Sequence, residues 1–211
     1  GNGGGIFFDA NNGDLNISNT TIQDNHAYSR GGGICIDGAS NAIIENSRIL
    51  SNTSSGSRGG GLYSNVTSLS LSGSVLANNF AAGGGGGIYL GYSSPNILSN
   101  FTLYNNNTGS FGGAIYSQSQ ANISNVTILQ NSGANGYIGI DDNNTVLTNS
   151  NIIGNLGEFI DINFTGLYTV ANNYWGHLSG PYHQIQNPSG QGDSVNIYVD
   201  VDSWLTAPNT N

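Results

Sequence analysis

The sequence of 211 residues has little or none of several residue types that major protein classes need. It contains one cysteine, no methionine and no lysine, so that its three basic residues are all arginines. The single cysteine, Cys35, excludes a disulfide framework and a thiolate metal cage. With a net charge of −9 there is no basic surface for phosphates, and we expect no nucleic-acid partner. No apolar run approaches the roughly 20 residues that span a bilayer, so we expect no transmembrane segment.

Proline is also rare, with four residues, whereas glycine and asparagine each occur 33 times and serine 26 times. These three abundant types favour turns and disfavour helices, so the composition excludes a helical bundle. Hydrophobic residues make up only 36% of the chain and charged residues 7%. Apolar residues nevertheless recur along the whole sequence, which is compatible with a folded core.

A short segment that ends in asparagine recurs six times at spacings of 27, 27, 27, 25 and 24 residues. Its copies are NTTIQDN ending at Asn25, NSRILSN at Asn52, GSVLANN at Asn79, NFTLYNN at Asn106, NVTILQN at Asn131 and NSNIIGN at Asn155. A glycine-rich element before an apolar residue repeats in step with it. These apolar residues are Ile6, Ile34, Leu62, Ile88, Ile115 and Ile138. A period of this length indicates a solenoid, because one repeat is too short to bury its own apolar face.

Within each repeat the apolar residues alternate with polar ones, as Leu15 and Ile17 do, which is the period of a strand. Each repeat is therefore expected to form about three short strands that stack on the equivalent strands of the next repeat. The sequence predicts an all-β fold, a right-handed parallel β-helix of about seven coils of 24–28 residues, one of them shorter. We assign residues 1–175 to the coils and residues 176–211 to a C-terminal capping or strand-addition segment.

The six repeat-ending asparagines are predicted to be structural. Stacked carboxamides can hydrogen-bond to one another along a parallel stack and can also satisfy backbone groups in turns. We therefore expect a ladder of Asn25, Asn52, Asn79, Asn106, Asn131 and Asn155.

These repeats resemble a known group of proteins. The GGGI and GGAI elements, together with (T/S)(I/L)xxN, are similar to the GGA(I/L/V) and FxxN repeats of the chlamydial polymorphic outer-membrane proteins and of adhesin-like β-helix proteins. The segment NNYWGHLSGPYHQIQNPSGQGD, from Asn172 to Asp193, looks like the tail that closes many extracellular β-helix proteins. The resemblance implies an extracellular or cell-surface protein that is not an enzyme, either an adhesin or a subunit of a filament or envelope.

The alternative is a polysaccharide-active protein, because the β-helix is also the scaffold of pectate lyases and polygalacturonases. Without lysine, a lyase base would have to be Arg30 or Arg58, which we expect in neighbouring coils. Asp9 and Asp37 share a column and form a candidate Ca²⁺ pair, although Ca²⁺ takes six to eight oxygens. No acid spacing marks a hydrolase pair. We therefore expect no catalytic, cofactor-binding or metal residue, and a lyase, a hydrolase or a carbohydrate-binding module is the alternative.

A column of aromatic residues follows the glycine-run apolar position by one residue. It contains Phe7, Tyr63, Tyr89 and Tyr116, with Cys35 in the same column. Alternation makes this column point outward, so the sequence predicts an exposed aromatic ladder. The ladder either stabilises the sheet laterally or docks a glycan or another subunit. Cys35 either pairs between molecules or is an idle thiol.

Ten N-x-S/T sequons occur, and five of them lie off the expected ladder columns. These candidate glycosylation sites are Asn16, Asn65, Asn122, Asn143 and Asn163. The sequons at Asn19, Asn52, Asn100, Asn106 and Asn125 are expected to be engaged inside turns.

The two ends of the β-helix are expected to present unpaired strand edges. The sequence opens inside a glycine run, so we expect an exposed first coil that an upstream segment or a neighbouring molecule would cover. The alternating segment from Val195 to Trp204 is expected to add as a strand to an edge, in cis or in trans. Head-to-tail self-association is therefore the predicted partnership, beside a surface glycan or protein.

Overall fold

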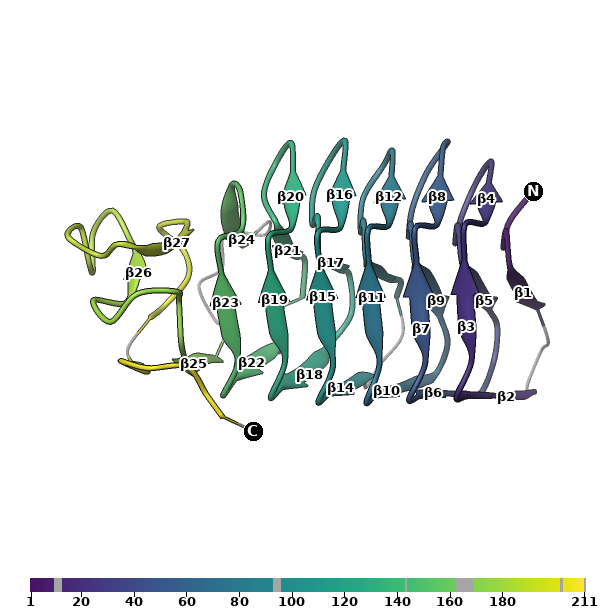
Figure 1. The fold of residues 1–211 in the computed structure, drawn as a ribbon, viewed down its shortest axis with the longest axis horizontal. Helices are drawn as coiled ribbons and strands as arrows, with labels where there is room; N and C mark the ends of the chain where they lie inside the picture. Colours follow the sequence, from purple (N-terminus) through teal and green to yellow (C-terminus); the bar gives the residue numbers. More distant parts are fainter. Residues whose placement is uncertain (10–12, 93–95, 143, 162–168, 202, 211) are drawn as a thin grey trace.

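The computed structural model describes residues 1–9, 13–92, 96–142, 144–161, 169–201 and 203–210. These residues form 28 short strands and no helix, and the strands stack coil upon coil into one elongated solenoid (Figure 1). The coils advance from the N-terminus to the C-terminal segment, which lies at the opposite end (Figure 1). The predicted all-β parallel β-helix of about seven coils is confirmed.

Four parallel sheets run along the solenoid. Sheet A contains β1 (Ile6–Asp9), β5 (Ile34–Asp37), β9 (Leu62–Asn65), β13 (Ile88–Leu90), β17 (Ile115–Ser117), β21 (Ile138–Ile140), β24 (Glu158–Asp161), β27 (Gly192–Val195) and β26 (Pro181–Tyr182). Sheet B contains β2 (Asp14–Ser18), β6 (Asn41–Glu45), β10 (Ser68–Ser72), β14 (Asn96–Ser99), β18 (Ala121–Ser124), β22 (Val146–Thr148), β25 (Thr169–Asn173) and β28 (Ser203–Trp204).

The other two sheets are shorter. Sheet C contains β3 (Thr21–Gln23), β7 (Arg48–Leu50), β11 (Val75–Ala77), β15 (Thr102–Tyr104), β19 (Thr127–Leu129) and β23 (Asn151–Ile153). Sheet D contains β4 (His26–Ala27), β8 (Thr53–Ser54), β12 (Phe80–Ala81), β16 (Asn107–Thr108) and β20 (Ser132–Gly133). Because of sheet D a coil has four strands, whereas the sequence repeats predicted about three. Its strands have only two residues, and the buried residue is small (Ala27, Ser54, Ala81 and Thr108), so hydrophobic alternation gave no signal for it.

The core is a set of columns in which equivalent residues stack from coil to coil. Leu71 of β10 pairs with Ile44 of β6 on one side and with Leu98 of β14 on the other. All three of these side chains are 0% exposed, as the sequence columns predicted. Similar columns from sheets A and C complete one continuous apolar core.

The glycine runs form the connection between sheets D and A, where the chain turns inside a crowded corner. Gly59 has a φ of +68°, which a residue with a side chain rarely adopts. A Cβ on Gly60 would collide with the carbonyl oxygen of Phe80 in strand β12 of the next coil. The GGG elements are therefore required by close backbone packing.

The C-terminal segment adds its strands to the end of its own solenoid. β27 pairs with β24 in sheet A, and β28 pairs with β25 in sheet B, so the strand addition occurs in cis. The single alternating strand expected from Val195 to Trp204 is wrong, because a turn separates the two strands and leaves Ile197 41% exposed. At the other end, Ile6, Phe8 and Leu15 are only partly buried against the core.

The core register predicts the effect of one substitution. Leu71→Ala should lower the free energy of unfolding by about 2 to 5 kcal/mol, because the rigid stack cannot collapse around the cavity. Ser70→Ala, one residue away on the outward face, is the control and should change it by about 0.5 kcal/mol or less. Chemical denaturation of both variants measures the difference. Equal effects would contradict the assigned inside and outside of β10.

Candidate functional site

A ladder of buried asparagine side chains runs along the corner between sheets C and D. In each rung the backbone N–H and the side-chain Nδ2 of one asparagine donate to Oδ1 of the asparagine in the next coil. For Asn79, these bonds to Asn106 measure 3.0 and 2.9 Å. Nδ2 also donates to a carbonyl in the preceding coil, which for Asn79 is that of Ile49 at 2.9 Å. The six asparagines of the ladder are Asn25, Asn52, Asn79, Asn106, Asn131 and Asn155.

The ladder ends on a carboxylate from the C-terminal segment. Asp193 Oδ2 accepts from the backbone N–H of Asn155 at 2.9 Å and from its Nδ2 at 2.7 Å, while Oδ1 accepts from Gly154 N–H at 2.8 Å. Burial raises the pKa of Asp193, and these hydrogen bonds oppose that rise. Asp193 thus takes the place of the next asparagine and joins the C-terminal segment to the coils.

A second asparagine column lies at the corner between sheets B and C and differs from the ladder. Its members have left-handed backbones and include Asn19 (φ 50°), Asn100 (φ 55°) and Asn125 (φ 54°). The expectation that these sequons are engaged inside turns is wrong for Asn19 and Asn100, whose side chains are exposed. It holds for Asn52 and Asn106, which are 0% exposed in the ladder. Asparagine suits the second column because it tolerates the left-handed backbone region, and it suits the ladder because its side chain both donates and accepts hydrogen bonds.

Tyrosines stack on the outer face of sheet A. The rings of Tyr63 and Tyr89 have centroids 5.4 Å apart and an interplanar angle of 14°, and those of Tyr89 and Tyr116 are 5.0 Å apart at 26°. Pairing in register, one coil apart, sets these spacings. The column therefore forms a lateral stack, which is one of the two roles considered for it.

The predicted exposure of this column is wrong at its centre. Tyr63 and Tyr89 are 4% and 1% exposed, whereas Phe7 at the first coil is 50% exposed. The column does point away from the main core, but the rings cover one another and side chains from the flanking turns lie over them. Cys35 is buried in the same cluster, and burial raises the pKa of its thiol to about 12, so that it stays protonated.

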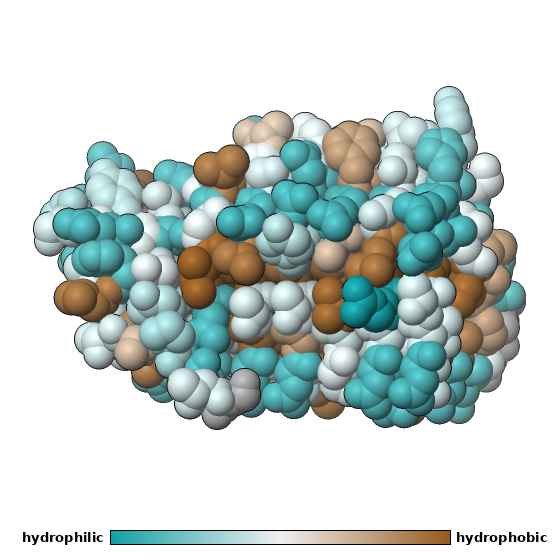
Figure 2. Space-filling view, viewed as in Figure 1, coloured by the Kyte–Doolittle hydropathy of each residue, from teal (hydrophilic) through white to brown (hydrophobic). Residues whose placement is uncertain are grey.

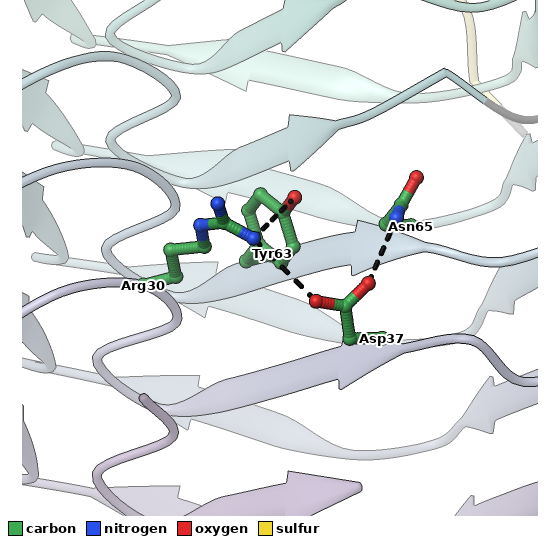
Figure 3. Close-up of polar contacts among 4 residues, drawn as sticks. All are labelled: Arg30, Asp37, Tyr63 and Asn65. Carbon is green, nitrogen blue, oxygen red and sulfur yellow. Dashed lines mark hydrogen bonds and ion pairs between the residues drawn. The ribbon is translucent and has the colours of Figure 1, made fainter. Parts of the chain in front are cut away.

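Arg30 is one of the side chains that cover the tyrosines (Figure 3). Its guanidinium carbon lies 5.0 Å from the ring centroid of Tyr63, and Nη1 donates to Tyr63 Oη at 3.2 Å. The same Nη1 forms an ion pair with Asp37 Oδ2 at 3.4 Å. Asp37 Oδ1 in turn accepts from Asn65 Nδ2 at 2.8 Å. Each of the four polar groups is thus engaged by another in a closed cluster.

Arg58 repeats this position one coil further on. Its guanidinium carbon lies 4.9 Å from the ring centroid of Tyr89. The Tyr89 hydroxyl hydrogen-bonds to Gln118, and Gln118 Nε2 donates to the hydroxyl of Tyr92 at 2.9 Å. Arg30 and Arg58 carry like charges in neighbouring coils, and Asp37 and the two tyrosine rings reduce the repulsion between them.

The remaining candidate residues of the sequence analysis are spread over the molecule. Asp9 and Asp37 are paired in register, but Asp9 is exposed and Asp37 is occupied by Arg30 and Asn65. Among the residues that the structure describes, no group of three or more His, Cys, Asp or Glu side chains gathers into a metal site. Of the candidate glycosylation sites, Asn16 and Asn122 are exposed and Asn65 is half-buried. Asn143 and Asn163 lie outside the described residues.

The outer face of sheet C carries a band of apolar side chains along the solenoid (Figure 2). Its members are Leu50, Ala77, Tyr104, Leu129 and Ile153, which pair in register from coil to coil. They are half-buried or buried except for Tyr104, which is 38% exposed. Figure 2 shows polar side chains on both sides of this band.

Two contacts of the C-terminal segment escaped the sequence analysis. The first is Asp193, which the tail motif contains but which no repeat spacing connects with the asparagine column. The second is Asn209, whose backbone N–H donates to Asn151 Oδ1 at 2.8 Å and whose carbonyl accepts from Asn151 Nδ2 at 3.0 Å. In each of these two contacts the two residues are far apart in the sequence, so that only the folded structure reveals the contact.

Within the described part of the chain, no helix has the length and apolarity that crossing a membrane requires. Comparison with curated proteins and with solved structures finds no match to this chain. A family described as right-handed beta helix region does match, over residues 4–174. This match covers the coils from the first glycine run to the last strand of sheet B before the C-terminal segment. The chain belongs to the right-handed β-helix family.

Proposed function

We propose that this chain is a non-enzymatic extracellular surface protein, adhesin-like or a structural subunit of a filament or envelope. The observation that carries the proposal is the use of its polar and aromatic side chains in lateral ladders. The asparagines bond from coil to coil, the tyrosines stack, and Arg30 and Arg58 lie over tyrosine rings. Such a surface suits rigidity and recognition.

A polysaccharide lyase or hydrolase would need a different arrangement. A hydrolase requires two acids around one substrate position, and a lyase requires a base together with acids. The described residues contain one ion pair, between Arg30 and Asp37, and an arginine remains protonated in proteins. Three surface hollows have volumes of about 470, 430 and 310 Å³. The first is lined by a single acid, Asp14, the second by a single acid, Glu158, and the third by no acid. No arginine lines any of the three. These features favour a binding or structural role.

Assembly of copies end to end remains part of the proposal. Within the described residues, sheet A begins at β1 and ends at β26, and each of these strands has a neighbour on one side only. Because the strands β27 and β28 already pair in cis, the contact would involve the outer edge of β26 and not the segment that we expected.

The proposal predicts binding without turnover. Purified protein incubated with a panel of neutral and acidic polysaccharides should release no reducing ends and no unsaturated uronate absorbance above the blank. A pectate lyase and a polygalacturonase serve as positive controls in the same assay. Catalytic release from any substrate, lost in Asp37→Asn or Arg30→Gln, would establish the enzyme alternative.

The extracellular part of the proposal predicts where glycans attach when a glycosylating cell secretes the protein. Asn16 and Asn122 are exposed on the outer face of sheet B and should be occupied, whereas Asn52 and Asn106 are fully buried and should not be. Mass spectrometry of glycosidase-treated peptides measures the occupancy of each sequon. Occupied Asn52 or Asn106 together with empty Asn16 and Asn122 would contradict the assignment.

A further inference from the structure

The outer face of sheet C carries almost no charge, although the protein is acidic. Two outward columns run along its six strands, which lie side by side in Figure 1. The first column contains Thr21, Arg48, Val75, Thr102, Thr127 and Asn151, and the second adds Gln23 to the apolar band. Arg48 is the only charged residue in the two columns, whereas the chain has 12 acids. Two copies of this face would therefore meet without opposing acids.

The middle of the apolar band has a projection beside a depression. Tyr104 of β15 is the most exposed member of the band at 38%, whereas its neighbour in register, Ala77 of β11, is 6% exposed and ends at Cβ. Leu50 and Leu129 lie one strand further out, on either side of this pair. The band is thus uneven at its centre and similar at its flanks. A second copy in reverse order would complement this pattern.

We propose that the outer face of sheet C binds the same face of a second copy of the chain, with the two solenoids antiparallel. A two-fold axis along the strand direction, midway between β11 and β15, places Tyr104 of each copy over Ala77 of the other and Leu50 over Leu129. Each tyrosine ring then fills the space above an alanine, and the apolar band is removed from water. The contact uses a different surface from the ends of the solenoid, and it does not depend on the proposed function.

Arg48 favours the antiparallel orientation over the parallel one. In a parallel pair equal coils would face one another, so that the two exposed Arg48 side chains would meet across the axis and repel. In the antiparallel pair Arg48 of β7 faces Thr127 of β19, whose hydroxyl can accept a hydrogen bond from the guanidinium. The two arginines then start from positions three strands apart, or about 14 Å.

The size of the face sets the expected strength of the contact. Between its left-handed corners, at Asn19 and Asp24 in the first coil, the face is about 17 Å wide, and its six strands span about 24 Å. A flat area of roughly 400 Å² on each copy belongs to the small interfaces that form weak, transient complexes. We therefore expect a dissociation constant on the order of 10 to 100 μM.

Sedimentation equilibrium of the full chain, produced without glycans, measures the dissociation constant between about 1 μM and 1 mM protein. Tyr104→Ala and Ala77→Tyr should each weaken the dimer by about tenfold or more, because the first leaves a hole and the second sets two rings against each other. The double variant Ala77→Tyr/Tyr104→Ala exchanges the projection and the depression and should restore most of the wild-type affinity. Such a rescue requires that the two positions face each other across the interface.

The matched control is Ile97→Ser, which removes an apolar side chain that is 51% exposed on the outer face of sheet B and should leave the dissociation constant unchanged. Thermal melting verifies that every variant is folded. A wild-type chain that stays monomeric at about 1 mM would overturn the proposal. Single variants with unchanged affinity, a double variant no better than the single ones, or an Ile97→Ser variant as weak as Tyr104→Ala would also overturn it.

Discussion

A ladder of hydrogen-bonded asparagine side chains fixes how each coil sits on the next. Oδ1 of Asn79 accepts from both the backbone N–H and the side chain of Asn52, which aligns the two coils along the strands and across the corner. A shift by one residue would leave buried donors and acceptors without partners, a cost of about 1 to 3 kcal/mol for each group. The apolar columns favour stacking in general, whereas the ladder selects one register.

The features of the outer surface depend on that register. The tyrosines of sheet A can stack only if equivalent residues lie one strand spacing apart, as Tyr63 and Tyr89 do. The same alignment places each arginine over the tyrosine of the following coil, so that Arg30 reaches Tyr63 and Arg58 reaches Tyr89. Asp37 forms an ion pair with Arg30, whereas the equivalent residue of the next coil, Asn65, carries no charge.

The periodic parts of this molecule could be read from the sequence because every coil repeats the same physical requirement. Spacing alone identified the core columns, the Asn79 ladder and the outward direction of Tyr89. Burial of Tyr89 was missed, because alternation gives the direction of a side chain and not what covers it. Sheet D was missed because its inward residues, such as Ala81, are small. Asp193 belongs to no repeat, and its contact with Asn155 depends on the path of the C-terminal segment.

The ladder is tested most directly by removing one internal rung. Asn79→Ala removes four buried side-chain hydrogen bonds and should lower the free energy of unfolding by on the order of 4 kcal/mol, measured by chemical denaturation. The control is Asn78→Gly, which changes the preceding exposed residue, keeps its left-handed backbone (φ 57°) and should cost less than about 1 kcal/mol. If Asn79→Ala is as stable as this control, the apolar core alone sets the register and the account is contradicted.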